Sequence, residues 1–228
     1  MKVRILETLG EAGQARGVCV VIDVFRAATT ACVLSEQGAE VLAAPDLESA
    51  LRWRAAGSGR LVLAERGGEP RPEADLGNSP HLALGLDLAG RQVAMCTSAG
   101  TPALFAALAA ADAVLMGAFV NASALERRLR ELDPEDVTLL AAGAGGVEPC
   151  MEDRMAALYL KNQLEAFPNS MEALDRFLRG APAAQKFLDP ALTWAPAEDL
   201  DICLTLDRVD FALAAESGPE GLVRLVRA

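Results

Sequence analysis

Histidine and lysine are nearly absent from this chain of 228 residues. It has one histidine, His81, and three lysines, and its formal net charge is −11. A single histidine excludes mechanisms that need a histidine cluster, and a Ser-His-Asp triad would have to use His81 itself. The negative charge disfavours nucleic acid as a partner, because binding of DNA or RNA relies on Lys and Arg contacts with phosphates.

Paired cysteines and long apolar runs are also missing. The five cysteines are widely spaced and form no CxxC pair, so we predict neither a structural zinc site nor a redox dithiol, and interpret them as reduced, buried thiols. No uncharged apolar stretch of about 18 residues is present, which predicts no membrane span and no membrane partner. The first ten residues lack the apolar core of a signal peptide, so we expect a cytoplasmic location.

Apolar residues make up 52% of the chain, enough for the core of a single domain over residues 1–228. Apart from Asp23, Val18–Val24 is a continuous apolar run rich in β-branched residues, as in strands buried on both faces of a parallel sheet. Other strands are expected at Glu40–Ala44, Leu61–Ala64, Gln92–Cys96, Ala113–Met116 and Val137–Ala142, with helices at Arg26–Gln37, Asp46–Ala56, Thr101–Ala111, Asn121–Leu132 and Glu152–Ala166. The alternation predicts an α/β fold, a mostly parallel sheet with helices on both faces.

Residues 168–198 interrupt this alternation. Prolines and Gly180 separate short helical pieces at Ser170–Leu178 and Ala183–Leu188, which predicts a helical C-terminal insertion and suggests a contact surface for a homo-oligomer. Ile202–Leu206 is predicted as a last strand returning to the sheet. The amphipathic segment Asp207–Ala228 is compatible with either helix or strand.

Polar and glycine residues follow each predicted strand. Ligands of open α/β sheets bind beyond the carboxyl ends of the strands, so these residues are the candidate site. Ser98, Gly100 and Thr101 lie at a strand-to-helix turn whose backbone N–H groups would favour phosphate, although Thr101 is equally suited to cap the helix. Four more candidates for binding the substrate or its phosphate follow other strands: Asn78, Ser79, Asn121 and Gly145.

Carboxylates also follow the predicted strands. If Glu65, Glu152 and Asp153 converge, their oxygens suit Mg²⁺, whereas the alternative is that Glu152 and Asp153 only favour the first turn of a helix. Asp23 ends the most apolar strand and is our first candidate for a metal ligand or a nucleophile. The alternative is a structural carboxylate that pairs with Arg26 or caps the next helix.

Two arginines, Arg26 and Arg66, follow core strands and are candidates to clamp phosphate or a second anionic group, or to form surface ion pairs. The stretch Gly143–Gly146 matches neither common nucleotide motif. Glu148 stands at the third glycine position of a dinucleotide fingerprint, and the Gly-Lys-Ser/Thr ending of a Walker A loop is absent. A nucleotide-binding oxidoreductase is therefore disfavoured.

Taken together, the motifs have a recognisable order. They are Val21–Thr30, Glu65–Gly68, Gly77–Pro80, Thr97–Thr101, Gly117–Asn121 and the stretch from Gly143 to Asp153. This combination resembles the 2-phosphosulfolactate phosphatase family over about residues 18–160. The resemblance implies a Mg²⁺-dependent acid phosphatase that hydrolyses (2R)-2-phospho-3-sulfolactate to sulfolactate and phosphate, a step of coenzyme M biosynthesis in archaea. Ala99 departs from the family's Thr-Ser-Asn-Gly-Thr turn.

The residues agree with a phosphatase of a small anionic phosphoester and leave two mechanistic choices open. The nucleophile is either a metal-activated water or a carboxylate, and the leaving-group acid is expected to be a carboxyl with a raised pKa because histidine is so scarce. The alternatives are a phosphatase of another small phosphorylated hydroxy acid, and a non-catalytic protein that binds an anionic metabolite. The second is disfavoured because several carboxylates would repel an anion unless a metal intervened.

Overall fold

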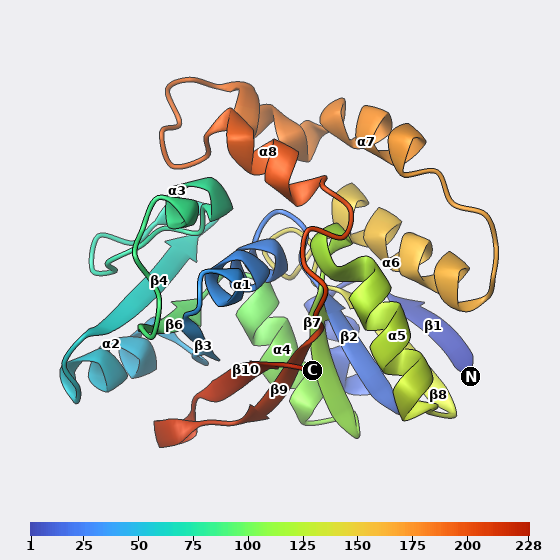
Figure 1. Ribbon diagram of the computed structural model, residues 1–228, viewed down its shortest axis with the longest axis horizontal. Coiled ribbons are helices and arrows are strands. Elements are labelled where there is room, and N and C mark those ends of the chain that lie inside the picture. Colours follow the sequence, from blue (N-terminus) through green and yellow to red (C-terminus); the bar gives the residue numbers. More distant parts are fainter.

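One sheet runs through the molecule (Figure 1). A computed structural model, which describes residues 1–228, has ten strands in the order β1-β8-β2-β7-β9-β10-β3-β6-β4-β5. Their bounds are β1 Lys2–Leu6, β2 Val18–Ile22, β3 Glu40–Ala43, β4 Arg60–Arg66, β5 Glu69–Pro70, β6 Gln92–Cys96, β7 Ala113–Gly117, β8 Asp136–Ala141, β9 Leu213–Ser217 and β10 Val223–Arg227. The sheet is mostly parallel, which confirms the predicted α/β class.

The parallel strands form two groups. One group is β1, β8, β2 and β7, and the other is β3, β6 and β4. Strand β9 pairs antiparallel with β7, strand β10 pairs antiparallel with β3, and the two pair with each other as a hairpin. The last strands of the chain therefore join the two parallel groups.

Strand β2 lies in the middle of its group, between β8 and β7. All five of its residues are buried, because both faces of the sheet are covered by helices and loops. This explains why it appears in the sequence as an unbroken apolar run. Asp23 follows directly after β2, at the carboxyl edge of the sheet where the neighbouring parallel strands also end.

The helices between the strands match the predicted ones closely. The matching helices are α1 Ala27–Glu36, α2 Leu47–Ala55, α4 Gly100–Leu108, α5 Ala122–Leu132 and α6 Met151–Leu164. The structure adds helices that the sequence did not predict, α3 Pro80–Leu84 and the short 3-10 helices η1 Leu9–Gln14, η2 Phe119–Asn121 and η4 Pro219–Gly221. Helix α2 begins where expected because the Asp46 carboxylate accepts a hydrogen bond from the Ser49 N–H. No helix of the structure is long and apolar enough to cross a membrane.

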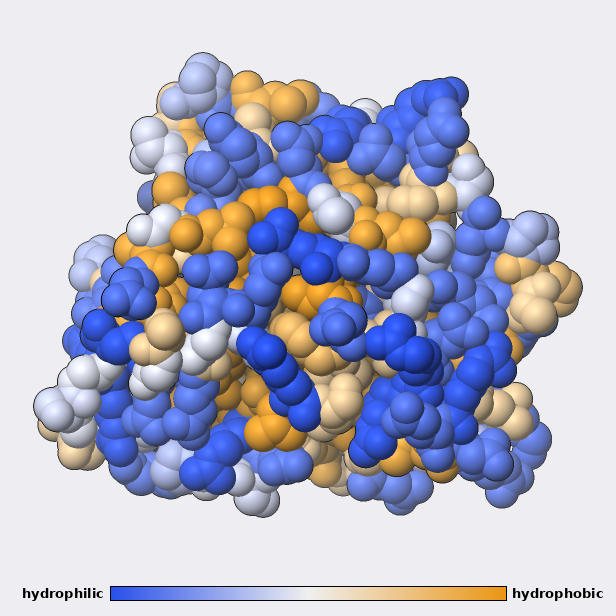
Figure 2. Space-filling view, in the orientation of Figure 1, coloured by the Kyte–Doolittle hydropathy of each residue, from blue (hydrophilic) through white to orange (hydrophobic).

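The predicted insertion is helical and lies across one end of the sheet. It contains α7 Met171–Arg179, η3 Pro182–Leu188 and α8 Ala197–Cys203, and Figure 1 shows α7 and α8 together above the rest of the molecule. Leu178, Ala184 and Phe187 are buried in the core cluster and anchor the segment. Apolar atoms gather along the border between this segment and the rest of the molecule in Figure 2.

The predicted strand at Ile202–Leu206 is wrong. Residues 197–203 form α8, whose Leu200, Ile202 and Cys203 are buried while Asp201 is exposed, so the apolar run covers the core as a helix. The ambiguous segment after it supplies the hairpin β9–β10. Strand β1 was not predicted, because its residues Lys2 to Ile5 alternate between exposed and half-buried at the edge of the sheet and include two charges.

Candidate active site

A cavity of about 300 Å³ lies at the carboxyl ends of the parallel strands. Asp23 reaches it from the end of β2, Glu65 from β4, and Ser98 from the turn between β6 and α4. The loop after β8 and the first turn of α6 supply another wall, and Lys186 comes from η3 in the insertion. The position agrees with the general rule for ligand sites in open α/β sheets.

Asp23 is held at the floor of the cavity by the start of α1. Its Oδ1 accepts a hydrogen bond from the Ala27 N–H at 2.9 Å, and the side chain is almost fully buried. Burial raises the pKa of Asp23 to about 6, the hydrogen bond from Ala27 opposes this rise, and the charges of Glu65 and Glu152 add to it. Ionising Asp23 is therefore costly unless a cation is close.

Asp153 connects three parts of the site. Its Oδ1 accepts from the Val24 N–H at 2.8 Å and its Oδ2 from the Gly143 N–H at 3.1 Å, so it joins the loops after β2 and β8 to α6. Burial raises the pKa of Asp153 well above its ordinary value, and repulsion by Asp23 and Glu152 adds to the effect.

Glu152 carries a polar atom without a partner. Its Oε2 is buried and makes no hydrogen bond, and the residue is only 6% exposed. Buried polar groups are almost always hydrogen-bonded, and an unpaired carboxylate oxygen is among the most expensive exceptions. Because this oxygen belongs to a residue that lines the cavity beside Asp23 and Asp153, the donor set fits a hard divalent cation.

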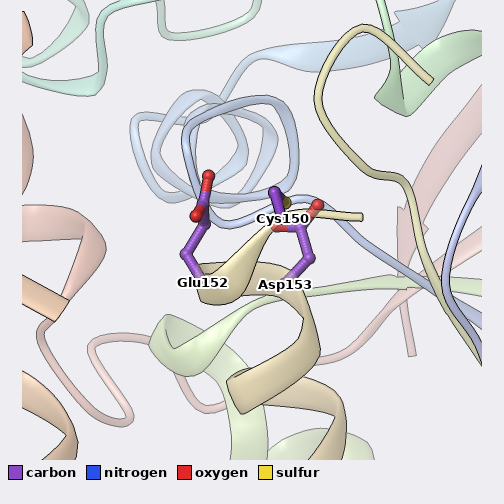
Figure 3. Close-up of side chains that lie close together, drawn as sticks. All are labelled: Cys150, Glu152 and Asp153. Carbon is purple, nitrogen blue, oxygen red and sulfur yellow. The ribbon is translucent and has the colours of Figure 1, made fainter. Parts of the chain in front are cut away.

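Cys150 completes the cluster at the start of α6 (Figure 3). One atom each from Cys150, Glu152 and Asp153 lie within 4.8 Å of one another, with Asp153 beside Cys150 and Glu152 set apart from them. Burial raises the pKa of the Cys150 thiol, and the charges of Asp153 and Glu152 raise it further. The thiol therefore stays protonated beside Asp153. From its sequence context, Cys150 is predicted only to be an ordinary buried thiol.

Glu65 orders the wall opposite α6. Its Oε1 accepts from the Ser98 N–H at 2.6 Å, and its Oε2 accepts from the Gly68 N–H at 2.5 Å and the Ser98 hydroxyl at 3.0 Å. The Ser98 hydroxyl oxygen also accepts from the Gly67 N–H at 2.8 Å. The carboxylate thus ties the loop after β4 to the turn before α4.

Gly100 and Thr101 build this turn without lining the cavity. A Cβ on Gly100 would lie 2.7 Å from Asp23 Oδ2 and 2.7 Å from the Ala27 Cβ, so only glycine allows α4 to pack this closely on Asp23. The Thr101 hydroxyl accepts from the Thr97 N–H at 2.9 Å and donates to the Thr97 carbonyl. Both residues shape the site from behind it.

Arg26 lines the cavity and joins the sheet to the insertion. Its guanidinium forms a fully buried ion pair with Asp199 at 2.5 Å and donates to the carbonyl oxygens of Trp194 at 2.8 Å and Gly68 at 3.0 Å. Asp199 also accepts from the Ser79 hydroxyl at 2.7 Å and from the His81 N–H at 2.9 Å. Arg26 therefore links the start of α1 to α8 and to two loops.

Lys186 is the second cation of the cavity, and the sequence analysis missed it. Its Nζ donates to the Phe25 carbonyl at 3.4 Å and lies 5.0 Å from the centre of the Phe187 ring. Burial lowers the pKa of Lys186 and the charge of Arg26 lowers it further, while Glu152 and Asp23 oppose the shift. No motif marks this residue, because its approach depends on how the insertion folds over the sheet.

Eight of the predicted site residues do meet in this cavity. They are Asp23, Arg26, Glu65, Asn78, Ser98, Gly145, Glu152 and Asp153. Asn78 resembles Glu152 in one respect: its buried Oδ1 has no hydrogen-bond partner. Two unsatisfied acceptors in one cavity indicate a ligand that carries positive charge or donor groups.

Five predicted residues lie outside the cavity. Gly100 and Thr101 are described above, and Ser79 caps α3, its oxygen accepting from the Leu82 N–H. Asn121 is buried and closes the turn after β7, where its Oδ1 accepts from the Ala118 N–H at 3.0 Å. Arg66 is exposed at the end of β4 and lines a neighbouring cavity.

The fold and the cavity define an α/β protein with its ligand site at the carboxyl edge of a parallel sheet, built from buried carboxylates that suit a divalent cation and faced by two cations. Comparison with known proteins narrows this class. The sequence profile of 2-phosphosulpholactate phosphatase matches residues 4–217. The chain therefore belongs to the 2-phosphosulfolactate phosphatase family.

Similar proteins from several bacteria carry the name probable 2-phosphosulfolactate phosphatase. One from Thermus thermophilus is 45% identical over 148 residues, which is 64% of this chain and 61% of that protein. One from Deinococcus radiodurans is 43% identical over 130 residues, 57% of this chain and 54% of the relative. One from Synechococcus sp. WH7803 is 35% identical over 191 residues, which is 81% of this chain and 72% of that protein. The first two alignments span only about 54–61% of the relatives' own length.

Proposed function

We propose that this chain is a Mg²⁺-dependent phosphoric monoester hydrolase that converts 2-phospho-3-sulfolactate to 3-sulfolactate and phosphate. The observation that carries the proposal is the buried, unpartnered Glu152 Oε2 in a cavity shared with Asp23, Glu65 and Asp153. The substrate is taken from the names of the relatives, and the metal-dependent hydrolysis is inferred from the carboxylates of the cavity.

The charge balance of the cavity supports a metal cofactor. Four carboxylates line it, against two cations, and Arg26 is already paired with Asp199. A phosphate dianion would be repelled by this arrangement unless a divalent cation intervened. Glu152, Asp153 and Asp23 would hold Mg²⁺, whereas Glu65, which already accepts hydrogen bonds from Ser98 and Gly68, would shape the opposite wall. When bound, the ion would neutralise the phosphate oxygens and stabilise the charge of the transition state.

The chain's own residues have separate tasks. Lys186 contacts the phosphate as a point charge, and Asp23 either attacks the phosphorus atom or orients the attacking water. The leaving alkoxide needs a proton. No histidine lines the cavity to supply this proton, and the carboxylates that would hold Mg²⁺ are ionised, so the proton comes from another acid.

The direct test is phosphate release from 2-phospho-3-sulfolactate by the purified chain, with Mg²⁺ and with EDTA. We expect activity with Mg²⁺, none with EDTA, and recovery when Mg²⁺ is restored. Glu152→Gln should lose most of the activity and Glu48→Gln, which changes an exposed carboxylate on α2, should not. Full activity in EDTA would overturn the metal assignment, and no phosphate release under any of these conditions would overturn the proposed reaction.

One observation favours a second substrate of the same kind. Ala99 lines the cavity where the family's Thr-Ser-Asn-Gly-Thr turn has an amide side chain. A lost amide contact is compatible with another small phosphorylated hydroxy acid, and a panel of such esters in the same assay would show it by a higher kcat/KM. A role in coenzyme M biosynthesis, a cytoplasmic location and a homo-oligomeric state stay predictions.

A further inference from the structure

A second cavity, of about 610 Å³, adjoins the first. The two share Glu65, Gly67, Ser98 and Gly145 as a common wall. The rest of the second cavity comes from the start of α2, the ends of β4 and β6, and the loop after β5. The two cavities are therefore neighbours on either side of the Ser98 turn.

The second cavity differs from the first in its positive side chains. Arg66 is exposed and its guanidinium forms no ion pair. Arg71 pairs with Glu73 at 3.1 Å, but its buried Nε has no hydrogen-bond partner. Two guanidinium groups with unused donors are well suited to an oxyanion, because their planar N–H groups match pairs of oxygens.

The two carboxylates of this cavity are already engaged. Asp46 Oδ1 accepts from the Ser49 N–H at the start of α2, and both oxygens of Glu65 accept hydrogen bonds from Ser98 and Gly68. Cys96 is neutral, since burial raises the pKa of its thiol to about 11. No carboxylate oxygen resembling Glu152 Oε2 is left unsatisfied here, so this cavity suits an anion bound by arginine without a metal.

We infer that the second cavity binds the sulfonate of the substrate through Arg66 and Arg71 while the phosphate occupies the first cavity. The inference rests on the proposed function, which gives the substrate a phosphate and a sulfonate on neighbouring carbons. A sulfonate is ionised at all physiological pH values and presents three oxygens, so it gains from guanidinium donors and gains little from Mg²⁺. Arg66 is thereby a specificity residue rather than a catalytic one.

The test compares two phosphate esters that differ only in the sulfonate, 2-phospho-3-sulfolactate and 2-phospholactate. In the Arg66→Gln and Arg71→Gln double variant, we expect kcat/KM for the first ester to fall by about tenfold or more, corresponding to at least about 1.4 kcal/mol. The loss on 2-phospholactate should be at least tenfold smaller. The Arg52→Gln and Arg176→Gln double variant, which removes two exposed arginines on α2 and α7, is the control for the loss of two positive charges and should behave as wild type.

A binding measurement separates this inference from the proposed reaction. By calorimetry, wild type should bind 3-sulfolactate at least tenfold more tightly than lactate, and the double variant should bind both equally. The single Arg66→Gln variant guards against loss of fold, because Arg66 is exposed. Equal losses on both esters, or an unchanged preference for 3-sulfolactate, would overturn the sulfonate site. A sulfolactate preference without phosphate release would keep the site and overturn only the reaction.

Discussion

The strand ends and the helical insertion contribute opposite charges to one cavity. The sheet and α6 supply Asp23, Glu65, Glu152 and Asp153, whereas the insertion supplies Lys186 and, through Asp199, holds Arg26 in place. Backbone N–H groups fix Asp23, Glu65 and Asp153 by hydrogen bonds, and the lysine depends on a segment outside the sheet. The sheet alone would therefore repel an anion, and the insertion alone has nothing to bind a metal.

Asp23→Asn tests the carboxylates at the strand ends, and of all the variants it should have the largest effect on activity. If Asp23 is a metal ligand or the nucleophile, activity should fall by about 10³-fold or more. The variant should melt at the same temperature or higher, because burial and the charges of Glu65 and Glu152 disfavour the ionised side chain. Asparagine can still accept from the Ala27 N–H, so the turn is preserved.

The measurement is kcat and melting temperature on one preparation, with Asp87→Asn, an exposed carboxylate, as the control. A destabilised but fully active Asp23→Asn protein would show that Asp23 is a structural partner of α1 and would leave the strand ends without their central catalytic group.

Asp199→Asn tests the attachment of the insertion. Removing one charge from a buried ion pair leaves Arg26 uncompensated, so the free energy of unfolding should fall by about 3 to 5 kcal/mol. Asp201→Asn on the same helix is the matched control. Asp201 pairs with Arg179 at the surface, and its loss should change the free energy by less than about 1 kcal/mol. Equal effects in urea denaturation would mean that the buried pair does not hold the insertion.

The pH dependence of stability is a further test of Asp23, the carboxylate at the end of β2. The pKa of Asp23 is raised from 3.8 to about 6 on folding, so its contribution to stability is fully present below pH 3.8 and is lost as pH rises through 6. In EDTA, wild type should lose about 2 kcal/mol relative to Asp23→Asn between pH 4 and 7. Urea denaturation at both pH values checks this, and added Mg²⁺ at pH 7 should recover much of the loss. If the wild type instead became more stable relative to Asp23→Asn as the pH rose, the result would contradict the assignment.

Lys186→Met tests the contribution of the insertion to binding and should have the smallest effect. Methionine keeps an apolar stem against Phe25 and Phe187 but removes the charge that faces the carboxylates. We expect kcat/KM to fall about tenfold, about 1.4 kcal/mol, mainly through a higher KM. Lys2→Ala, at an exposed position, is the control in the same steady-state assay. An unchanged KM would assign Lys186 to packing of η3.

Elements that are buried on both faces could be predicted from the sequence, whereas elements at an edge or with one exposed face could not. Strands β2, β3, β6, β7 and β8 were predicted within two residues because strands covered on both faces appear as short apolar runs. Strand β1 lies at an edge and α8 carries an apolar run on one helical face, so neither shows that pattern. The hairpin β9–β10 was left undecided because its placement between β7 and β3 depends on partners distant in the sequence.

Site residues at the ends of core strands could be predicted from the sequence, whereas those that tertiary packing brings to the cavity could not. The four carboxylates were found because parallel strands bring their carboxyl ends to one edge, a rule that needs only strand order along the chain. Lys186 and Cys150 carried no such signal. Lysine in a helical segment and cysteine before a helix are ordinary residues until tertiary packing places them at the cavity. Thr101, Asn121 and Ser79 had the right chemistry, but their polar atoms close local turns or, for Ser79, also join the Asp199 network.

The position of the hairpin β9–β10 has a consequence for the newly made chain. Translation proceeds from the N-terminus, so residues 213–227 leave the ribosome after β3 and β7, the strands that they join. Until then the facing edges of β3 and β7 lack their permanent neighbours, and open strand edges invite pairing with other chains. Deletion of residues 213–227 would therefore do more harm than the length of the deleted segment suggests. It would leave the two groups of parallel strands without the hairpin that joins them, and the open edges of β3 and β7 would favour aggregation.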